Sequence, residues 1–499
     1  MNKELNTPLR KAHLDGLQLD WSYQFLAPET IENYVKKRLP ANFDELREQL
    51  LSGSFQNPSE GRSVSHVLSR SVESVVKDVK TSKFATIVRK LRSGNWLGAT
   101  GKPITDIVNI GVGGSDLGPL MTSFALAEFA SDVQQHRIQT HFVSSMDGGQ
   151  LYAVLPIVDP ETTLFIVASK SFGTIDTFAN VDTVREWIKP AFANVGKTVT
   201  DWLQNHMIGL SANPQRMSDY GIPPAHQITF SQSVGGRFSM WSAIGLSIAT
   251  TCGLRVFERL LAGAHNMDQH FSSAPLLQNI PMLMAITGLY NREERGINNL
   301  AILPYDGRFR HLPSYLQQLD MESNGKQCDF ADHPIDYPTG PIIWGGFGPN
   351  GQHAFFQHLH QGYDKFSADF VLVRKRQAAK FTESVQQSLA RQQDLAVANC
   401  LAHRRLMAFG FRGESARDHY PGDNPTNLLA IDELTPETFG ALVAAYEHKV
   451  FIQGVVWKLN SFDQPGVERG KKIAEDMLLR MQGKSEQVFD ESTEAQLKS

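Results

Sequence analysis

The chain has 499 residues, which is enough for two to four structural units and a large buried core. Hydrophobic residues make up 41% and charged residues 20%, as in ordinary globular proteins, and the net charge of -4 excludes a broad basic surface for nucleic acid. A local anion site stays possible, because backbone N–H groups alone can build one.

Cysteine usage and the apolar stretches indicate a cytoplasmic protein. The three cysteines, Cys252, Cys328 and Cys400, lie far apart and match neither a disulfide framework nor a zinc motif, which favours a reducing compartment. The first eight residues contain no apolar run typical of a signal peptide. The apolar stretch 240–254 is interrupted by Ser and Thr and is shorter than the ~20 residues of a membrane span, so we expect no contact with a membrane.

The N-terminal part of the chain differs in character from the rest. The first 95 residues are rich in charge and helix formers and show no strand-like run, so we expect peripheral helices there. After Lys102-Pro103, short apolar runs alternate with amphipathic stretches, which is typical of parallel sheets with crossover helices. The first half predicts strands at 104–110, 139–143, 163–168, 207–210 and 227–230, and helices at 119–130, 176–187 and 240–254.

The second half repeats this pattern. It predicts strands at 299–303, 341–344 and 370–373, and helices at 352–361, 436–459 and 465–480. The helix at 436–459 is apolar enough to be mostly buried, and we expect the polar tail from Gly483 to fray. The sequence therefore predicts the α/β class, with two doubly wound α/β/α sandwich domains built on parallel sheets.

A glycine-rich segment at 109–118 joins the first expected strand to a helix. Free N–H groups at such a helix start suit an anion. The segment is not a dinucleotide-binding motif, because Asp116 stands where the third glycine should be, and it is not a Walker loop, because no Gly-Lys-Ser/Thr follows. Alone, it fits an anion site and a tight turn without a ligand about equally well.

A second loop, Ser-Lys-Ser-Phe-Gly-Thr at 169–174, also lies between an expected strand and an expected helix. Its three hydroxyls and the ammonium of Lys170 suit a phosphate monoester, whose oxygens accept hydrogen bonds. Open α/β sheets bind their ligands at the carboxyl ends of the strands, where such loops lie. A solvated loop is the alternative, but two loops of this kind in one sheet favour a phosphate site.

Three charged side chains stand in segments that could carry catalysis. Arg237 follows two glycines and could stabilise an anionic intermediate, although a surface turn also explains a single Gly-Gly-Arg. Glu322 precedes a helix-ending Asn-Gly and could act as a general base, although a solvated helix residue is the ordinary alternative. Lys471 directly follows Gly470, and a surface ion pair with a glutamate is its alternative.

Three histidines lie close together at His353, His358 and His360. Their spacings are five and two residues, whereas metal ligands on one helix face stand three or four residues apart. The cluster therefore fits a metal badly, and we expect one catalytic histidine and two structural ones.

Taken together and in this order, the motifs resemble the phosphoglucose isomerase family over about residues 100–475. Three stretches carry the likeness: Gly-Gly-Arg-Phe-Ser from 235, Asp-Met-Glu-Ser-Asn-Gly-Lys at 320–326, and the segment from Ser-Phe-Asp-Gln to Gly-Lys at 461–471. The resemblance implies two sugar isomerase (SIS) domains at 96–255 and 256–461. It also implies an N-terminal helical region at 1–95, packed on the second domain, and a C-terminal helical arm at 462–499.

The resemblance also implies a reaction. It is the interconversion of glucose 6-phosphate and fructose 6-phosphate, in glycolysis and gluconeogenesis, without a metal or cofactor. Glu322 would move a proton between C2 and C1, Arg237 would steady the cis-enediol(ate), and His360 and Lys471 would open and close the sugar ring. A homodimer would form each site between two subunits. The implied binding residues for the phosphate and the sugar are Gly114, Ser115, Ser169, Lys170, Ser171, Thr174, Gln318 and Gln464.

Several positions depart from the family pattern. Threonine is usual where this chain has Ser171 and Gly173, glutamate where it has Asp176, and tryptophan where it has Pro465. Pro349, in the loop before the histidines, is also atypical. Ser171 keeps its hydroxyl, so we expect phosphate binding to survive, while the changes at positions 173 and 176 could alter affinity without changing the reaction.

Two other functions remain open at this point. One is a metal-dependent isomerase that uses the three histidines and Glu322. The other is a sugar-phosphate sensor with SIS domains and no catalysis, which would keep the Ser/Thr loops and lose Glu322, Arg237 and Lys471. All three of those residues are present, which favours the enzyme.

Overall fold

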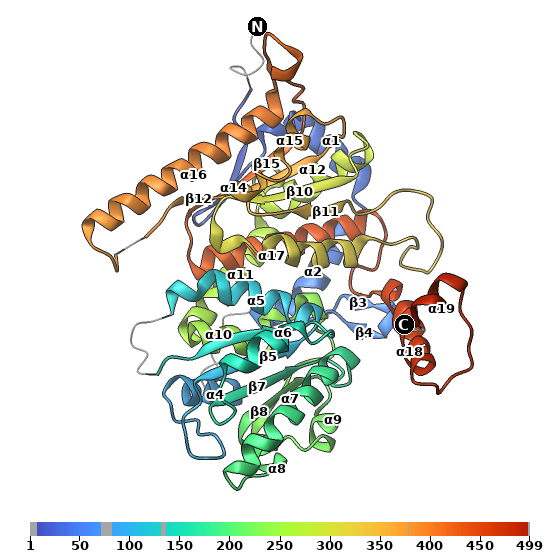
Figure 1. Ribbon diagram of the computed structural model, residues 1–499. Coiled ribbons are helices and arrows are strands. Elements are labelled where there is room, and N and C mark those ends of the chain that lie inside the picture. The colour runs from blue at the N-terminus through green and yellow to red at the C-terminus, as the bar shows by residue number, and fades with distance from the viewer. Residues whose placement is uncertain (1–6, 71–81, 131–135, 378, 498–499) are drawn as a thin grey trace.

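The structure is a computed structural model that describes residues 7–70, 82–130, 136–377 and 379–497. Two α/β domains lie one above the other in Figure 1, with helices between them. The first, lower domain contains five parallel strands in the order β6-β5-β7-β8-β9. They are β5 (Asp106–Gly111), β6 (Gln139–Val143), β7 (Thr163–Ala168), β8 (Met207–Ser211) and β9 (Gln227–Thr229).

The strand order places two loops side by side. All six residues of β7 are buried, as expected for a parallel strand covered by helices on both faces. The chain adds β6 on one side of β5 and then crosses to place β7 on the other side. Ligands bind at such a switch point in open α/β sheets, and here the loops after β5 and β7 diverge. The helices of this domain are α4 (Lys83–Arg92), α5 (Leu117–Leu126), α6 (Gly149–Val154), α7 (Ile175–Asn194), α8 (Val199–His206), α9 (Pro214–Asp219) and α10 (Leu246–Cys252).

The second domain has a six-stranded sheet in the order β1-β2-β15-β12-β10-β11. Four adjacent strands of this sheet are parallel to one another: β10 (Asn299–Pro304), β11 (Ile342–Gly345), β12 (Ser367–Lys375) and β15 (Thr426–Glu433). The other two, β1 (Lys11–Leu14) and β2 (Leu17–Asp20), form a hairpin that pairs antiparallel with β15.

This hairpin corrects the expectation that the first 95 residues contain only helices and that both sheets are purely parallel. Asp15 and Gly16 both have positive φ, 32° and 80°, as a two-residue hairpin turn requires. Leu17 and Leu19 are buried and alternate with partly exposed residues, so the hairpin buries one face. The Asp-Gly pair was therefore a usable hairpin signal in the sequence.

Helices follow the hairpin in the N-terminal part, as expected. They are α1 (Pro28–Arg38) and α2 (Phe43–Ser52). Tyr34 and Arg38 of α1 both bond the carboxylate of Glu293, at the end of α12 (Ile280–Glu293) in the second domain. A small hairpin then follows, with strands β3 (Gln56–Asn57) and β4 (Arg62–Ser63). Residues 1–6 and 71–81, also within the first 95, lie outside the described part of the chain.

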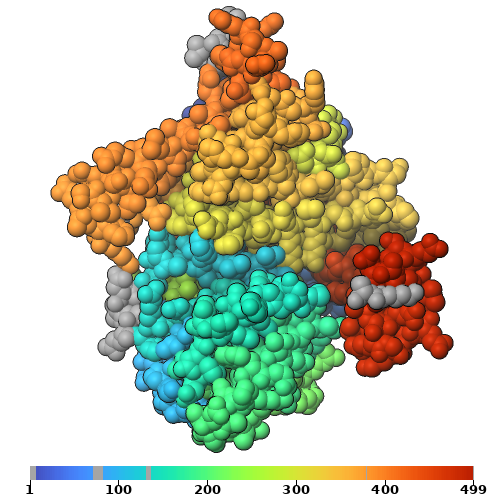
Figure 2. All heavy atoms as spheres, in the orientation of Figure 1, coloured from blue at the N-terminus to red at the C-terminus, as the bar shows by residue number. Residues whose placement is uncertain are grey.

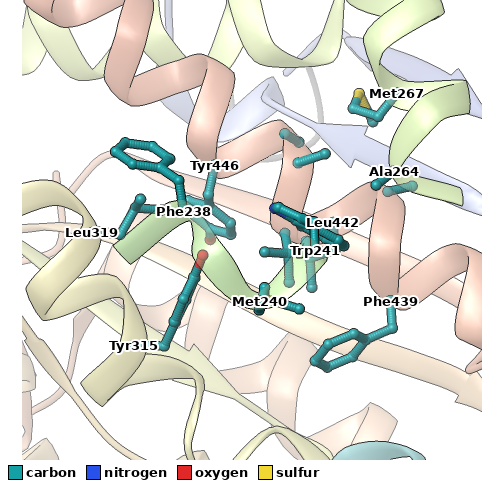
Figure 3. Packing of buried hydrophobic residues seen from close by; sticks show 14 of the residues in the cluster. Phe238, Met240, Trp241, Ala264, Met267, Tyr315, Leu319, Phe439, Leu442 and Tyr446 are labelled. Carbon is teal, nitrogen blue, oxygen red and sulfur yellow. The ribbon is translucent and has the colours of Figure 1, made fainter. Parts of the chain in front are cut away.

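The centre of the molecule is a helix pair between the two sheets. The helix α17 (Pro436–Val456) is buried along almost its whole length, which confirms the expected buried helix, and α11 (Leu254–Ser273) crosses it. Glycines make the crossing close: a Cβ added to Gly263 or Gly440 would overlap the backbone of the facing helix. Figure 3 shows the apolar side chains around this pair, with Trp241 and Phe238 of the first domain packed beside Leu442 and Tyr315. One continuous core therefore holds the two domains together.

All eight predicted strands are present, while two predicted helices were wrong in extent. The stretch 240–254 is not one helix: it starts as 3-10 turns, continues as α10 and ends at Gly253, whose φ is 100°. Of the stretch 352–361, only α15 (Phe356–Gln361) is helical, after a short α14 (Gly348–Gly351). Glycines at 351 and 253 mark both interruptions.

Several elements were not predicted. They include α6, α8, α9, α11 and α12, and also β15, the short α13 (Leu312–Leu316), the 27-residue α16 (Glu383–Phe409), and a small hairpin of β13 (Phe411–Arg412) and β14 (His419–Tyr420). At the C-terminus, α18 (Glu468–Met481) is followed by α19 (Glu491–Leu497), which an Arg480–Glu494 ion pair holds, so the expectation of a frayed tail is wrong there. This C-terminal arm, red in Figure 2, protrudes at one side of the molecule. In the described ranges, every helix is too short or too polar to cross a bilayer.

Candidate active site

A cavity of about 760 Å³ opens at the switch point of the first sheet. The loops after β5 and β7 form one wall, and segments of the second domain and of the C-terminal arm form the other. Every site residue expected from the sequence lines this cavity except His360. Those that line it are Gly114, Ser115, Ser169, Lys170, Ser171, Thr174, Arg237, Gln318, Glu322, Gln464 and Lys471.

Aromatic packing fixes the conformation of the Ser/Thr loop at 169–174. Phe172 has a positive φ of 49° and is buried, with its ring against Phe178 and Tyr220. The hydroxyls of Ser169 and Thr174 lie 2.9 Å apart, and Thr174 is the N-cap residue of the 20-residue α7. The loop thus presents hydroxyls and the N-terminal end of a long helix to the cavity, which suits an anion.

Lys170 brings a positive charge to the same loop. Burial, together with the nearby Arg62, lowers the pKa of Lys170 to about 8, and Glu60, 3.9 Å away, opposes this shift. Glu60 and Arg62 are paired with each other and line the cavity. They come from the β3–β4 hairpin, and nothing in the sequence of that hairpin indicated that it reaches the site.

Two glycine-rich segments touch each other next to this loop. A Cβ added to Gly114 would overlap the backbone of Gly236, so this close contact needs glycine at position 114, whereas a Cβ on Gly236 would meet open space. The contact places the backbone of Arg237, the residue after Gly236, against the glycine-rich segment at 109–118.

Arg237 is held by fixed acceptors. Its side chain is only 2% exposed, and Nε donates to Ser323 Oγ at 2.6 Å. Nη2 donates to the carbonyl oxygens of Ser461 at 2.6 Å and Asp463 at 3.1 Å, and Nη1 donates to Gln464 Oε1 at 3.2 Å. Burial lowers the pKa of the guanidinium from its ordinary value, but an arginine still stays charged.

Glu322 lies opposite this guanidinium. Its Oε2 is 3.6 Å from Arg237 Nη1, and its side chain is 22% exposed, toward the cavity. It ends a π-helical turn, Gln317–Glu322, a feature that occurs often at functional sites. The same turn carries Gln318, whose Nε2 lies against Gly113 of the first loop. An accessible carboxylate beside a buried cation can act as a base while the cation stabilises the charge that develops.

The C-terminal arm closes the cavity with Gln464 and Lys471. Lys471 Nζ lies 2.8 Å from Glu468, and both side chains are 62% exposed. The residue therefore forms the surface ion pair considered as its alternative and also lines the cavity.

His360 lies elsewhere. It is on α15 in the second domain, and its Nε2 is 2.9 Å from Nδ1 of His403. Burial, with His403 adjacent, lowers the pKa of His360 to about 4. His358 pairs with Asp364 at 3.3 Å. Within the described ranges, no three His, Cys, Asp or Glu side chains come together in a way that could hold a metal ion.

Two positions that depart from the family pattern, Gly173 and Asp176, lie beside Arg216 or in the cavity lining. A Cβ added to Gly173 would overlap Nη1 of Arg216, which donates to the Ser171 carbonyl at 3.2 Å. Arg216 and Asp176 both line the cavity. Arg216 was missed by sequence reasoning, because it stands far along the chain in α9 and carries no motif.

Comparison with known proteins places these features in one family. The family model for phosphoglucose isomerase matches residues 20–497. A glucose-6-phosphate isomerase of Idiomarina loihiensis is 66% identical over 481 residues, which are 96% of this chain and 97% of that protein. One of Psychrobacter cryohalolentis is 43% identical over 509 residues, 98% and 90% of the two chains.

A solved structure agrees with these matches. The crystal structure of a glucose-6-phosphate isomerase from Chlamydia trachomatis superposes with a TM-score of 0.82 at 27% identity, and it covers 98% of this chain and 92% of that one. Since the family model spans nearly the whole sequence and the three characteristic segments meet in one cavity, the chain belongs to the phosphoglucose isomerase family.

Proposed function

We propose that this protein interconverts glucose 6-phosphate and fructose 6-phosphate through ring opening and a cis-enediol(ate) intermediate. The observation that carries the proposal is the placement of Glu322 and Arg237 in one cavity with the Ser/Thr loop. Isomerisation of a sugar phosphate needs an anion site for the phosphate and, some distance away, a base beside a cation for the reacting carbons.

The phosphate binds at the carboxyl ends of β5 and β7. Ser115, Ser169, Ser171 and Thr174 offer hydroxyls, and the main chain near Lys170 and Gly114 offers N–H groups. The phosphate is remote from the reacting carbons. Its binding energy fixes the sugar so that C1 and C2 lie in turn before the same carboxylate.

Glu322 then takes the proton from C2 of the open-chain aldose and returns it to C1. The proton at C2 is weakly acidic, so its removal depends on stabilisation of the negative charge on O1. Arg237 provides a positive charge that is already held in place by Ser323 and by two carbonyl groups. Little reorganisation is then needed when the enediolate forms.

Ring opening needs one group that protonates the ring oxygen and another that accepts the proton of the C1 hydroxyl. Lys471 lines the cavity and can serve as one of them. His360 of the same chain does not reach the cavity, and we assign the second role to His360 of the partner subunit. The active unit is then a homodimer with shared sites.

We further propose that the protein acts in the cytoplasm, in glycolysis and gluconeogenesis. The composition supports an intracellular protein, since all three cysteines are free.

The test is a coupled assay that follows glucose 6-phosphate formation from fructose 6-phosphate. Turnover, with exchange of the C2 proton into solvent, is the expected result. Binding of both sugar phosphates without turnover would instead favour the sensor.

A further inference from the structure

Lys326 is a buried lysine just behind the cavity. It lies four residues after Glu322, and its side chain is 7% exposed. Its Nζ donates to the carbonyl oxygens of Asn460 at 2.6 Å and of Asp463 at 3.1 Å, and it lies 3.2 Å from the Asp463 carboxylate. The same ammonium reaches back to the carbonyls of Glu322 and Ser323.

These contacts join two segments that have different tasks. The carbonyls of Glu322 and Ser323 end the helical turn, where backbone acceptors lack partners in the helix and attract a cation. The carbonyls at 460 and 463 belong to the loop that carries Gln464. Arg237 donates to the carbonyls of Ser461 and Asp463 in the same loop, so Arg237 and Lys326 hold it together.

Lys326 does not touch the cavity. It is absent from the lining, although Glu322 is part of it. A substrate in the cavity therefore meets Glu322 and Arg237, whereas Lys326 can act only through them.

We propose that Lys326 is a positioning residue that fixes the Glu322 carboxylate relative to Arg237 by tying the π-helical turn to the 460–464 loop. The inference rests on the roles given above to Glu322 and Arg237. The carbonyl groups at the end of a helical turn have no N–H partner within the helix. Loss of the ammonium therefore leaves these carbonyl groups without a donor, and the turn shifts together with the base. The phosphate loop, on the first sheet, stays in place.

The first test is Lys326→Met, which keeps most of the aliphatic chain and removes the charge. A displacement of the base by about 1 Å costs up to ~100-fold in rate, so we expect kcat to fall between about 10-fold and 100-fold. The KM for fructose 6-phosphate should change by less than about threefold, because the phosphate contacts remain.

The matched control is Arg308→Met. Arg308 is also a largely buried cation, paired with Asp306 and Glu128, but it lies outside the cavity lining. Its loss should lower the melting temperature and leave kcat unchanged. If Arg308→Met lowers kcat as much as Lys326→Met does, the effect is general destabilisation and the proposal is wrong.

The pH profile of Lys326→Arg is the second readout. Burial and Arg237 lower the pKa of Lys326 to about 8, and Asp463 and Glu322 oppose this. The ammonium also acts on Cys328, where it opposes the rise in the pKa of the thiol that burial causes. When the ammonium loses its proton, the turn loses its anchor, so wild-type kcat should decline above about pH 8. An arginine stays charged, and Lys326→Arg should lack that decline.

These results decide the proposal in each case. A folded Lys326→Met with wild-type kcat, or with a raised KM alone, overturns it. If Lys326→Met does not fold, Lys326→Arg decides: loss of the alkaline decline supports the proposal and its persistence overturns it. Failure of the underlying function is separately visible: a wild-type protein without turnover would refute the isomerase, and a fully active Glu322→Gln would refute the role of Glu322 as the base.

Discussion

Nη1 of Arg237 lies 3.6 Å from Oε2 of Glu322, and the two residues come from different α/β domains. The guanidinium is almost fully buried and has its other N–H groups bonded, whereas the carboxylate is partly exposed to the cavity. The pair is therefore asymmetric: one member is fixed, and the other is accessible to a substrate. That asymmetry leads to the first prediction.

Glu322→Gln should lower kcat by about 10² to 10⁴-fold, the usual contribution of a general base, and leave KM within a few fold. Glutamine keeps the size and loses the basicity, so proton transfer suffers and binding does not. Exchange of solvent tritium into C2 should disappear in parallel. Glu186→Gln, an exposed residue of α7 outside the cavity lining, is the control and should keep wild-type turnover; exchange at the wild-type rate in Glu322→Gln would place the base elsewhere.

Much of the first sheet could be predicted from its sequence, for a physical reason. A parallel strand such as β7 is buried on both faces, so its six residues form a short apolar run that stands out between polar loops. The hairpin β1–β2 is half-exposed and has only four residues in each strand, which gave a weak pattern apart from its Asp-Gly turn. The motif at 320–326 did not indicate that Glu322 ends a π-helical turn.

The candidate site was predictable where its residues stand in motifs and not where the fold brings them from afar. Arg237, Glu322 and the two loops lie in recognisable segments. Glu60 and Arg62 reach the cavity on a small N-terminal hairpin, so only the three-dimensional arrangement brings them into view. Lys326 stands in the same motif as Glu322, but the motif does not show that its ammonium bonds the loop at 460–464. His360 is recognisable in sequence, yet within one chain it lies outside the cavity.

Thr174→Val should chiefly raise KM. The hydroxyl of Thr174 lies 2.9 Å from that of Ser169 at the start of α7, where the phosphate is proposed to bind. A contact equally strong in the ground and transition states affects KM, and loss of one hydrogen bond to a charged group costs about 1.5–3 kcal/mol, or roughly 10- to 100-fold. Thr174→Ser keeps the hydroxyl and should stay near wild type. Equal turnover of glucose and glucose 6-phosphate would contradict the phosphate role of the loop.

Activity should persist after dialysis against EDTA. In the proposed mechanism Arg237 provides the positive charge beside the reacting oxygen, and the histidines at 353, 358 and 360 have poor spacing for a metal. The measurement is the coupled assay before and after dialysis, with the metal content determined in parallel. Loss of activity that one divalent ion restores would favour the metal-dependent alternative.

Asp116→Asn should stabilise the protein above about pH 6. Burial raises the pKa of Asp116 to about 6, and its Oδ1 has no hydrogen-bond partner among the described residues. The unfolded carboxyl titrates near pH 3.9, so between pH 4 and 6 the folded state holds more protons and its stability falls as pH rises. Above pH 6 the whole cost, on the order of 2–3 kcal/mol, is present.

The melting temperatures of wild type and Asp116→Asn at pH 4 and pH 7.5 check this prediction. The gain should be visible at pH 7.5 and nearly absent at pH 4, where the wild-type carboxyl is protonated in the folded state. A gain of the same size at both values would show that charge is not its cause.

Mixed dimers can test whether His360 serves the neighbouring site. In the structure, His360 bonds His403 on the second domain and does not line the cavity that holds Glu322. Consider two inactive variants, Glu322→Gln and His360→Ala. In a mixed dimer with shared sites, one site combines an intact Glu322 with an intact His360, while the other carries both defects.

Random re-association makes about half of the dimers mixed, each with one good site of two, so activity should recover to about a quarter of wild type. If both residues serve the site of their own chain, no site is intact and mixing restores nothing. The two variants are unfolded together, refolded and assayed with fructose 6-phosphate, and each variant refolded alone gives the background. That background matters because sugar rings also open spontaneously, so His360→Ala can keep some turnover. Recovery no greater than the mean of the two separate refolding reactions would mean that His360 does not complete the partner's site, and the second ring-opening group would then have to come from the same chain as Glu322.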